Sequence, residues 1–116
     1  MRAHVNRQLI REVEREFNRI YPFLRIDFQK NGGGKADDPG YLGADEQALQ
    51  LKAKDLLKNE IKIADGMKVS ELETALQSAF AYPVQIFRKS GNFWIETRMT
   101  RSWTLKQQND HGGEIL

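Results

Sequence analysis

The fold is indicated first by residues 82–91, which read Tyr82-Pro83-Val84-Gln85-Ile86-Phe87-Arg88-Lys89-Ser90-Gly91. An earlier stretch has a similar pattern and reads Tyr21-Pro22-Phe23-Leu24-Arg25-Ile26-Asp27-Phe28-Gln29-Lys30-Asn31-Gly32. Each Tyr-Pro pair ends a segment with helical periodicity, because the residue before a proline is pushed out of the α region. The repeated unit is therefore a helix, a Tyr-Pro stop, an apolar strand and a glycine turn. The second copy is two residues shorter, so both an old duplication and a coincidence stay open.

Three segments have the apolar spacing of amphipathic helices. The first covers residues 4–20, and the second covers residues 44–57. The third begins at Ser70, where Ser70 and Glu73 have the spacing of a capping box. Residues Thr104 and Gln107 predict the cap of a short last helical turn, which a frayed tail at 110–116 follows.

Four segments have the composition of strands, at residues 23–29, 60–63, 84–89 and 93–99. The last two are joined through Ser90, Gly91 and Asn92 and predict a hairpin, since Gly and Asn tolerate the positive φ of tight turns. The glycine-rich residues 31–43 predict a flexible loop.

These elements predict an α+β fold in the order α-β-α-β-α-β-β, followed by the short C-terminal helical turn. Strands joined through a helix are expected to run parallel, and the last two antiparallel. The expected architecture is one domain over residues 1–116, with a mixed four-stranded sheet and helices packed mainly on one face. A β-grasp arrangement over residues 60–99 is the alternative.

The composition is that of an ordinary globular chain, with 116 residues, 40% hydrophobic and 29% charged. The absence of cysteine excludes disulfides, thiolate metal sites and cysteine nucleophiles. No apolar stretch is long enough to cross a membrane, and Met1-Arg2-Ala3-His4 lacks the apolar core of a signal peptide, so we expect a cytoplasmic protein. Basic residues are in excess at both ends of the chain and acidic residues in the middle.

Several motifs in the C-terminal half resemble a domain that recurs in uncharacterised bacterial proteins. The motifs are Lys68-Val69-Ser70-Glu71-Leu72-Glu73, Phe80, Val84-Gln85-Ile86-Phe87-Arg88-Lys89-Ser90-Gly91-Asn92, Trp94-Ile95-Glu96-Thr97 and Trp103-Thr104-Leu105-Lys106-Gln107-Gln108-Asn109. The resemblance covers residues 60–112. That family has no assigned activity, so the resemblance implies no catalytic residue.

The number of residues in the hairpin turn decides where Trp94 points. An even number places Val84 and Ile86 on one face with Phe93 and Ile95, and it places Phe87 and Trp94 together on the solvent side. An odd number moves Trp94 to the side of Ile86. An aromatic pair on the solvent side of a sheet is typical of a contact surface.

Three interpretations of this aromatic pair stay open. The terminal segment could cover it through Trp103 and Leu105, a protein partner or a second copy of this chain could cover it, or it could stack on single-stranded nucleic acid. The leading hypothesis is a protein-interaction or self-associating module. It assigns partner binding to five residues: Phe87, Lys89, Trp94, Arg98 and Trp103.

The nucleic-acid alternative uses the same aromatic pair with basic residues of the hairpin region, which are Arg88, Lys89, Arg98 and Arg101. A second basic series recurs every four residues on the first helix, at Arg7, Arg11, Arg15 and Arg19. Glutamates interleave that series at a spacing that favours local ion pairs, namely Arg11–Glu14, Glu12–Arg15 and Glu16–Arg19. We therefore interpret the series as a solvated helix face.

No combination of residues demands catalysis. His4 and His111 lie near the chain ends, and the acidic pairs Asp37-Asp38 and Asp45-Glu46 are explained by a turn and a helix start. The stretch Asn31-Gly32-Gly33-Gly34-Lys35-Ala36 lacks the hydroxyl residue of a phosphate-binding loop. The expectation is a protein without enzymatic activity, metal or cofactor.

Overall fold

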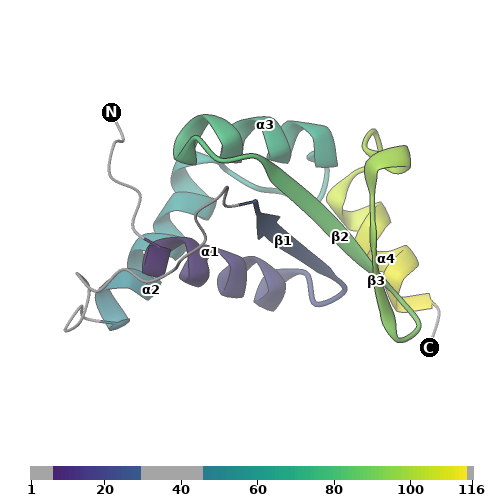
Figure 1. Ribbon diagram of the computed structural model, residues 1–116, viewed down its shortest axis with the longest axis horizontal. Coiled ribbons are helices and arrows are strands. Elements are labelled where there is room, and N and C mark those ends of the chain that lie inside the picture. Colours follow the sequence, from purple (N-terminus) through teal and green to yellow (C-terminus); the bar gives the residue numbers. More distant parts are fainter. Residues whose placement is uncertain (1–6, 30–45, 115–116) are drawn as a thin grey trace.

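The computed structural model describes residues 7–29 and 46–114 and contains both helices and strands, which confirms the mixed α and β class (Figure 1). Its elements, including a π-helical turn η2 and a 3₁₀ turn η3, are α1 (Arg7–Ile20), β1 (Leu24–Phe28), α2 (Glu46–Asp55), η2 (Leu56–Glu60), α3 (Val69–Phe80), β2 (Val84–Ser90), β3 (Phe93–Glu96), η3 (Arg98–Thr100) and α4 (Leu105–Glu114). Figure 1 shows α1 and α2 toward one end of the long axis, and the β2–β3 hairpin with α4 toward the other. The predicted loop at 31–43 lies outside the described residues.

Over residues 7–29 and 46–114 the sheet has three antiparallel strands in the order β1-β2-β3, so the predicted mixed four-stranded sheet is wrong. The missing strand is the one expected at residues 60–63. There the second helix continues through η2, and the N–H groups of Ile61 and Ile63 donate to the carbonyls of Leu56 and Leu57. Because helix-type bonds use these groups, Ile61 and Ile63 pack against the core from a loop rather than from a strand.

The absence of that strand also reverses the direction of β2. Two helices, α2 and α3, now separate β1 from β2. A crossover through one helix returns the chain to the end of the sheet at which the first strand began, so the next strand runs parallel to the first. The additional helix lets the chain reverse once more, so β2 returns antiparallel to β1 with Ile26 opposite Ile86.

The two Tyr-Pro units correspond to equivalent parts of the fold. Tyr21 and Pro22 lie between α1 and β1, and Tyr82 and Pro83 lie between α3 and β2, as the repeat predicts. The two strands of these units are hydrogen-bonded neighbours. The core of the molecule is therefore two helix-strand units paired through their strands, to which β3 and α4 are added.

The helices pack on one face of the sheet, as expected. The inward side chains of β1 and β2 form one cluster with the apolar sides of α1, α2, η2, α3 and α4, made of Ile10, Val13, Phe17, Tyr21, Leu24, Ile26, Phe28, Ala53, Leu57, Val69, Leu72, Leu76, Phe80, Val84, Ile86 and Leu105. Burial of this apolar surface is the main stabilising contribution to the fold. The side of the sheet on which these apolar side chains lie also determines which face is left without helices.

The predicted capping box at Ser70 and Glu73 is wrong by two positions. Helix α3 begins at Val69, and the N–H of Lys68 donates to Oε1 of Glu71 at 2.8 Å. The N–H groups of Val69 and Ser70 instead donate to the carbonyls of Trp103 and Arg101, each at 3.0 Å. A distant segment thus satisfies the first helical donors, which otherwise require a side-chain cap.

The Thr104 cap is confirmed, but the helix that it begins is longer than expected. The N–H of Thr104 donates to Oε1 of Gln107 at 2.8 Å, and the N–H of Gln107 donates back to Oγ1 of Thr104 at 3.1 Å. The frayed tail predicted from residue 110 is wrong over residues 110–114, which form the second half of α4.

Close approach to the sheet explains why α4 contains glycine. A Cβ atom at Gly112 would lie 2.9 Å from Cβ of Phe23, 3.1 Å from Cγ of Arg88 and 3.3 Å from the carbonyl oxygen of Lys89. The first distance is shorter than real Cβ contacts, and the other two are tighter than most of them. Glycine at this position therefore lets α4 touch the β1–β2 end of the sheet without displacing Phe23.

We expect Gly112→Ala to lower the free energy of unfolding by about 1–3 kcal/mol, because overpacking outweighs the better helix propensity of alanine. Urea unfolding followed by far-UV circular dichroism measures the change. Gly66→Ala is the matched control, since a Cβ there meets no atom within 4 Å, and it is expected to change stability by less than about 0.5 kcal/mol. An alanine at 112 that leaves stability unchanged contradicts the close contact.

Candidate functional site

The hairpin turn contains two residues, Gly91 and Asn92, because Ser90 pairs directly with Phe93. Gly91 has a φ of 61°. A positive φ at the first central position is the requirement of a type II′ turn, which favours glycine there. The even number of turn residues confirms the geometry that places Trp94 and Phe87 on the same side of the sheet.

We name this side, opposite the helices, the outer face. Its central side chains come from all three strands, since Arg25 pairs with Phe87, Phe87 with Glu96, and Lys89 with Trp94. The rings of Phe87 and Trp94 are half-buried. Two large aromatic side chains therefore lie on the face that the helices do not cover.

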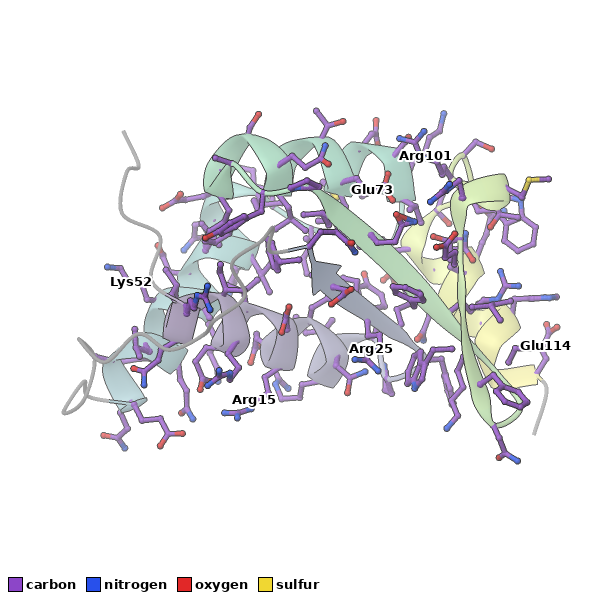
Figure 2. All side chains as sticks on the ribbon, viewed as in Figure 1. Arg15, Arg25, Lys52, Glu73, Arg101 and Glu114 are labelled. Atoms are coloured by element: carbon purple, nitrogen blue, oxygen red, sulfur yellow. The ribbon has the colours of Figure 1, made fainter. Side chains whose placement is uncertain are left out.

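Two cations lie against the indole of Trp94. The Cζ atom of Arg25 is 5.3 Å from the ring centroid, and Nζ of Lys89 is 5.7 Å from it. Both distances are in the range of a cation–π interaction. The sequence did not indicate Arg25 as a site residue, although the alternation of β1 puts it on the side opposite Leu24 and Ile26. The pairing of β1 with β2, and of β2 with β3, brings it to Trp94. Figure 2 labels Arg25 at β1.

A shallow groove of about 260 Å³ continues the outer face toward α1. Its lining residues are Arg11, Glu14, Arg15, Asn18, Arg25, Ile26 and Trp94. Arginines thus contribute much of its polar lining. The predicted ion pairs Glu12–Arg15 and Glu16–Arg19 are present on α1, at 2.8 and 2.7 Å. The carboxylate of Glu14 accepts a hydrogen bond from the N–H of Phe28.

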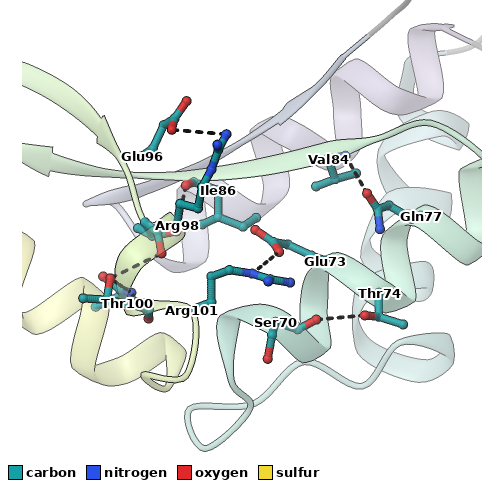
Figure 3. Close-up of polar contacts among 12 residues, drawn as sticks. Ser70, Glu73, Thr74, Gln77, Val84, Ile86, Glu96, Arg98, Thr100 and Arg101 are labelled. Atoms are coloured by element: carbon teal, nitrogen blue, oxygen red, sulfur yellow. Dashed lines mark hydrogen bonds and ion pairs between the residues drawn. The ribbon is translucent and has the colours of Figure 1, made fainter.

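The other basic residues of the hairpin region are engaged elsewhere. Arg98 lies just beyond β3 and forms an ion pair with Glu96 at 3.4 Å, and Arg101 forms one with the buried Glu73 at 3.0 Å (Figure 3). Arg88 lies on the helix side of the sheet, where its Nη1 donates to Oε1 of Gln108 at 2.7 Å. Of the four basic residues that the sequence connected with nucleic acid, Lys89 lies on the outer face and Arg98 reaches its rim through Glu96.

Trp103 lies apart from the other four predicted site residues. Its ring is edge-on to His111, with 5.5 Å between centroids, and 5.7 Å from the guanidinium of Arg88. Leu105 is fully buried in the core. Both residues belong to the helix side of the sheet, so the interpretation that they cover Phe87 and Trp94 is wrong. The sequence could not show this, because it did not indicate that α4 packs on β2.

The titratable groups with shifted pKa values lie away from the outer face. Burial raises the pKa of Tyr21, and the carboxylate of Asp65, which accepts the phenol hydrogen bond at 2.8 Å, raises it further. The hydrogen bond from Arg19 lowers the pKa of Glu16. Within residues 7–29 and 46–114, no three His, Asp or Glu side chains form a group that could hold a metal ion. No helix of these ranges has the length and apolarity to span a bilayer.

Comparisons of the chain with known protein families, curated proteins and solved structures find no significant match. This result is consistent with the uncharacterised family that the resemblance over residues 60–112 implies.

We expect the cations around Trp94 to attract anionic quenchers. In Trp103→Phe, Trp94 is the remaining tryptophan, and iodide is expected to quench its fluorescence at least about twofold more efficiently than caesium. Stern–Volmer titrations at constant ionic strength measure the ratio. The double variant that adds Arg25→Gln is the control, in which the ratio falls toward one. Equal quenching of Trp103→Phe by iodide and caesium contradicts the proximity of the two cations to Trp94.

Proposed function

We propose that this chain is a non-catalytic protein-interaction module that binds its partner through the outer face of the β2–β3 hairpin. The contact residues are Phe87, Lys89 and Trp94 from the hairpin, Arg25 from β1, and Arg98 at the rim. A cytoplasmic location and a bacterial source accompany this proposal as expectations from the sequence.

The observation that supports the proposal is the position of Trp94. A half-buried indole lies on a sheet face without helices and holds two cations against its ring. Tryptophan and arginine are enriched among the residues that dominate binding energy at protein interfaces. Aromatic side chains surrounded by charges are also the usual composition of such surfaces.

We expect Trp94→Ala to weaken self-association at least about tenfold while lowering the free energy of unfolding by less than about 1 kcal/mol, since the ring lies outside the core. Light scattering over a concentration series and urea unfolding measure the two effects. Trp103→Ala is the matched control, because the same truncation on the helix side should lower stability and leave association unchanged.

Two outcomes contradict the proposal. A loss of about 3–5 kcal/mol in Trp94→Ala is the cost of truncating a core aromatic residue, and it would give the ring a structural role. Monomeric behaviour of both the wild type and Trp94→Ala, with equal stability, would remove the self-associating form of the function.

Single-stranded nucleic-acid binding is the second candidate. The placement of Arg25 and Lys89 beside Trp94 favours it, because such proteins combine aromatic stacking platforms with cations for the phosphates. The contacts of Arg88 and Arg101 on the helix side of the sheet, and the ion pair of Arg98 with Glu96, count against it.

If the chain binds nucleic acid, a single-stranded oligonucleotide quenches Trp94 fluorescence in Trp103→Phe, and the affinity falls steeply with added salt. The titration is made in low-salt buffer, where the electrostatic attraction is strongest. Arg25→Gln serves as the control and should weaken the binding. Unchanged fluorescence under these conditions excludes the candidate.

A further inference from the structure

The two edges of the sheet, β1 and β3, have different surroundings. The edge of β1 faces α1, whose Asn18 side chain donates to the carbonyl of Leu24 at 2.8 Å, while Glu14 accepts from the N–H of Phe28. At the other edge, no described element pairs with the far side of β3. An open strand edge is a template for pairing with another strand.

The hydrogen-bond pattern identifies which groups β3 presents. The N–H of Thr97 donates to the carbonyl of Ile86, so Phe93, Ile95 and Thr97 direct their backbone groups toward β2. By alternation, Trp94 and Glu96 direct their N–H and carbonyl groups away from the sheet. The edge therefore offers two donors and two acceptors.

Apolar side chains flank this open edge. Phe93 is 72% exposed and Ile95 is 37% exposed, although both lie on the face that packs on helices nearer the centre of the sheet. Trp94 lies between them on the outer face. A short, exposed and apolar edge strand is the kind of surface that soluble proteins normally protect or pair.

We propose that β3 pairs antiparallel with β3 of a second copy of this chain, with Ile95 facing Ile95 of the second copy across a two-fold axis. The inference rests on the proposed function, because it names a second copy as the protein partner. The product is a continuous six-stranded sheet with one extended outer face.

The register follows from the available hydrogen bonds. With Ile95 on the axis, Trp94 of each copy faces Glu96 of the other, and all four free backbone groups of each strand are paired. A register centred on Trp94 pairs Glu96 with a turn residue, and one centred on Glu96 sets two carboxylates opposite each other. The axis at Ile95 avoids both.

Charge complementarity favours a second copy as the occupant. Within the described residues, Arg25 and Lys89 contact Trp94 and form no ion pair with a carboxylate. The proposed register places the Glu96 carboxylate of the second copy, which also pairs with Arg98 of its own chain at 3.4 Å, beside that same indole. One strand thus supplies both the cation-flanked ring and the carboxylate that complements it, as an isologous interface requires.

A single cysteine tests the register, because the chain has none of its own. In Ile95→Cys the two thiols face each other in a non-hydrogen-bonded pair, whose Cβ separation of about 4.5–5.5 Å approaches that of a disulfide. Phe93→Cys is the matched control, since the two-fold axis separates its thiols by about four residues, or roughly 13 Å. Both positions are solvent-accessible.

We expect oxidation to link Ile95→Cys into a dimer of twice the 13.4 kDa chain mass at least about tenfold faster than Phe93→Cys. Equal rates overturn the proposed pairing. The strands are short and the contact small, so the wild-type dimer is expected at about 100 µM and above, by sedimentation equilibrium. A monomer at about 1 mM also overturns it.

A charge substitution provides an independent measurement. Ile95→Lys sets two ammonium groups opposite each other and should raise the dimer dissociation constant at least about tenfold. Leu51→Lys, at a 67% exposed position on α2, makes the same change away from β3 and should leave the constant unaltered. Equal effects of the two substitutions contradict the edge pairing.

The failure of this inference and that of the proposed function give different results. If Trp94→Ala weakens association but the two cysteine variants cross-link equally, the edge pairing is wrong and the outer-face function stands. If Ile95→Cys cross-links selectively and Trp94→Ala leaves association unaltered, the edge pairing stands and the outer-face function is wrong.

Discussion

The antiparallel register of β2 against both of its neighbours is the constraint on which the other features depend. It sets Ile86 opposite Ile26 and Lys89 opposite Trp94. Because side chains alternate across a strand, these pairings divide β2 into an apolar side that meets the helices and an aromatic, charged side that does not. A shift of one residue would exchange the two sides and expose the core.

Helix α4 contacts a charged residue, Arg88, on the helix side of β2. Arg88 follows Ile86 on that side, where its Nη1 donates to Gln108 while its buried Nε has no hydrogen-bond partner. The amide nitrogen of Gln108, which is fully buried, in turn donates to the carbonyl and hydroxyl oxygens of Thr100. This polar chain links β2, η3 and α4, and its hydrogen bonds offset part of the cost of taking a guanidinium from water. It also explains why Trp103, beside Arg88, lies away from the outer face.

The outer face is left uncovered because the described helices lie on one side of the sheet. Three strands with helices on one side leave the opposite side chains partly exposed, and here these are Phe87 and Trp94 with two cations. The exposed apolar residues of β3 extend the same region to the sheet edge. This face and this edge are the surfaces that the proposed association would bury.

The sequence by itself determined the helix-strand units, because the local sterics at Tyr-Pro act over a few residues. It also identified the Thr104 cap, which depends on neighbours three positions apart. It left the number of residues in the hairpin turn open, and the pairing of Ser90 with Phe93 decided the side on which Trp94 lies. Only the tertiary structure decided the number of strands, the α3 start and the place of Arg25. Each of these depends on groups far apart in the chain: η2 takes the bonds of the expected strand, Trp103 and Arg101 cap α3, and the β1–β2 register brings Arg25 to Trp94.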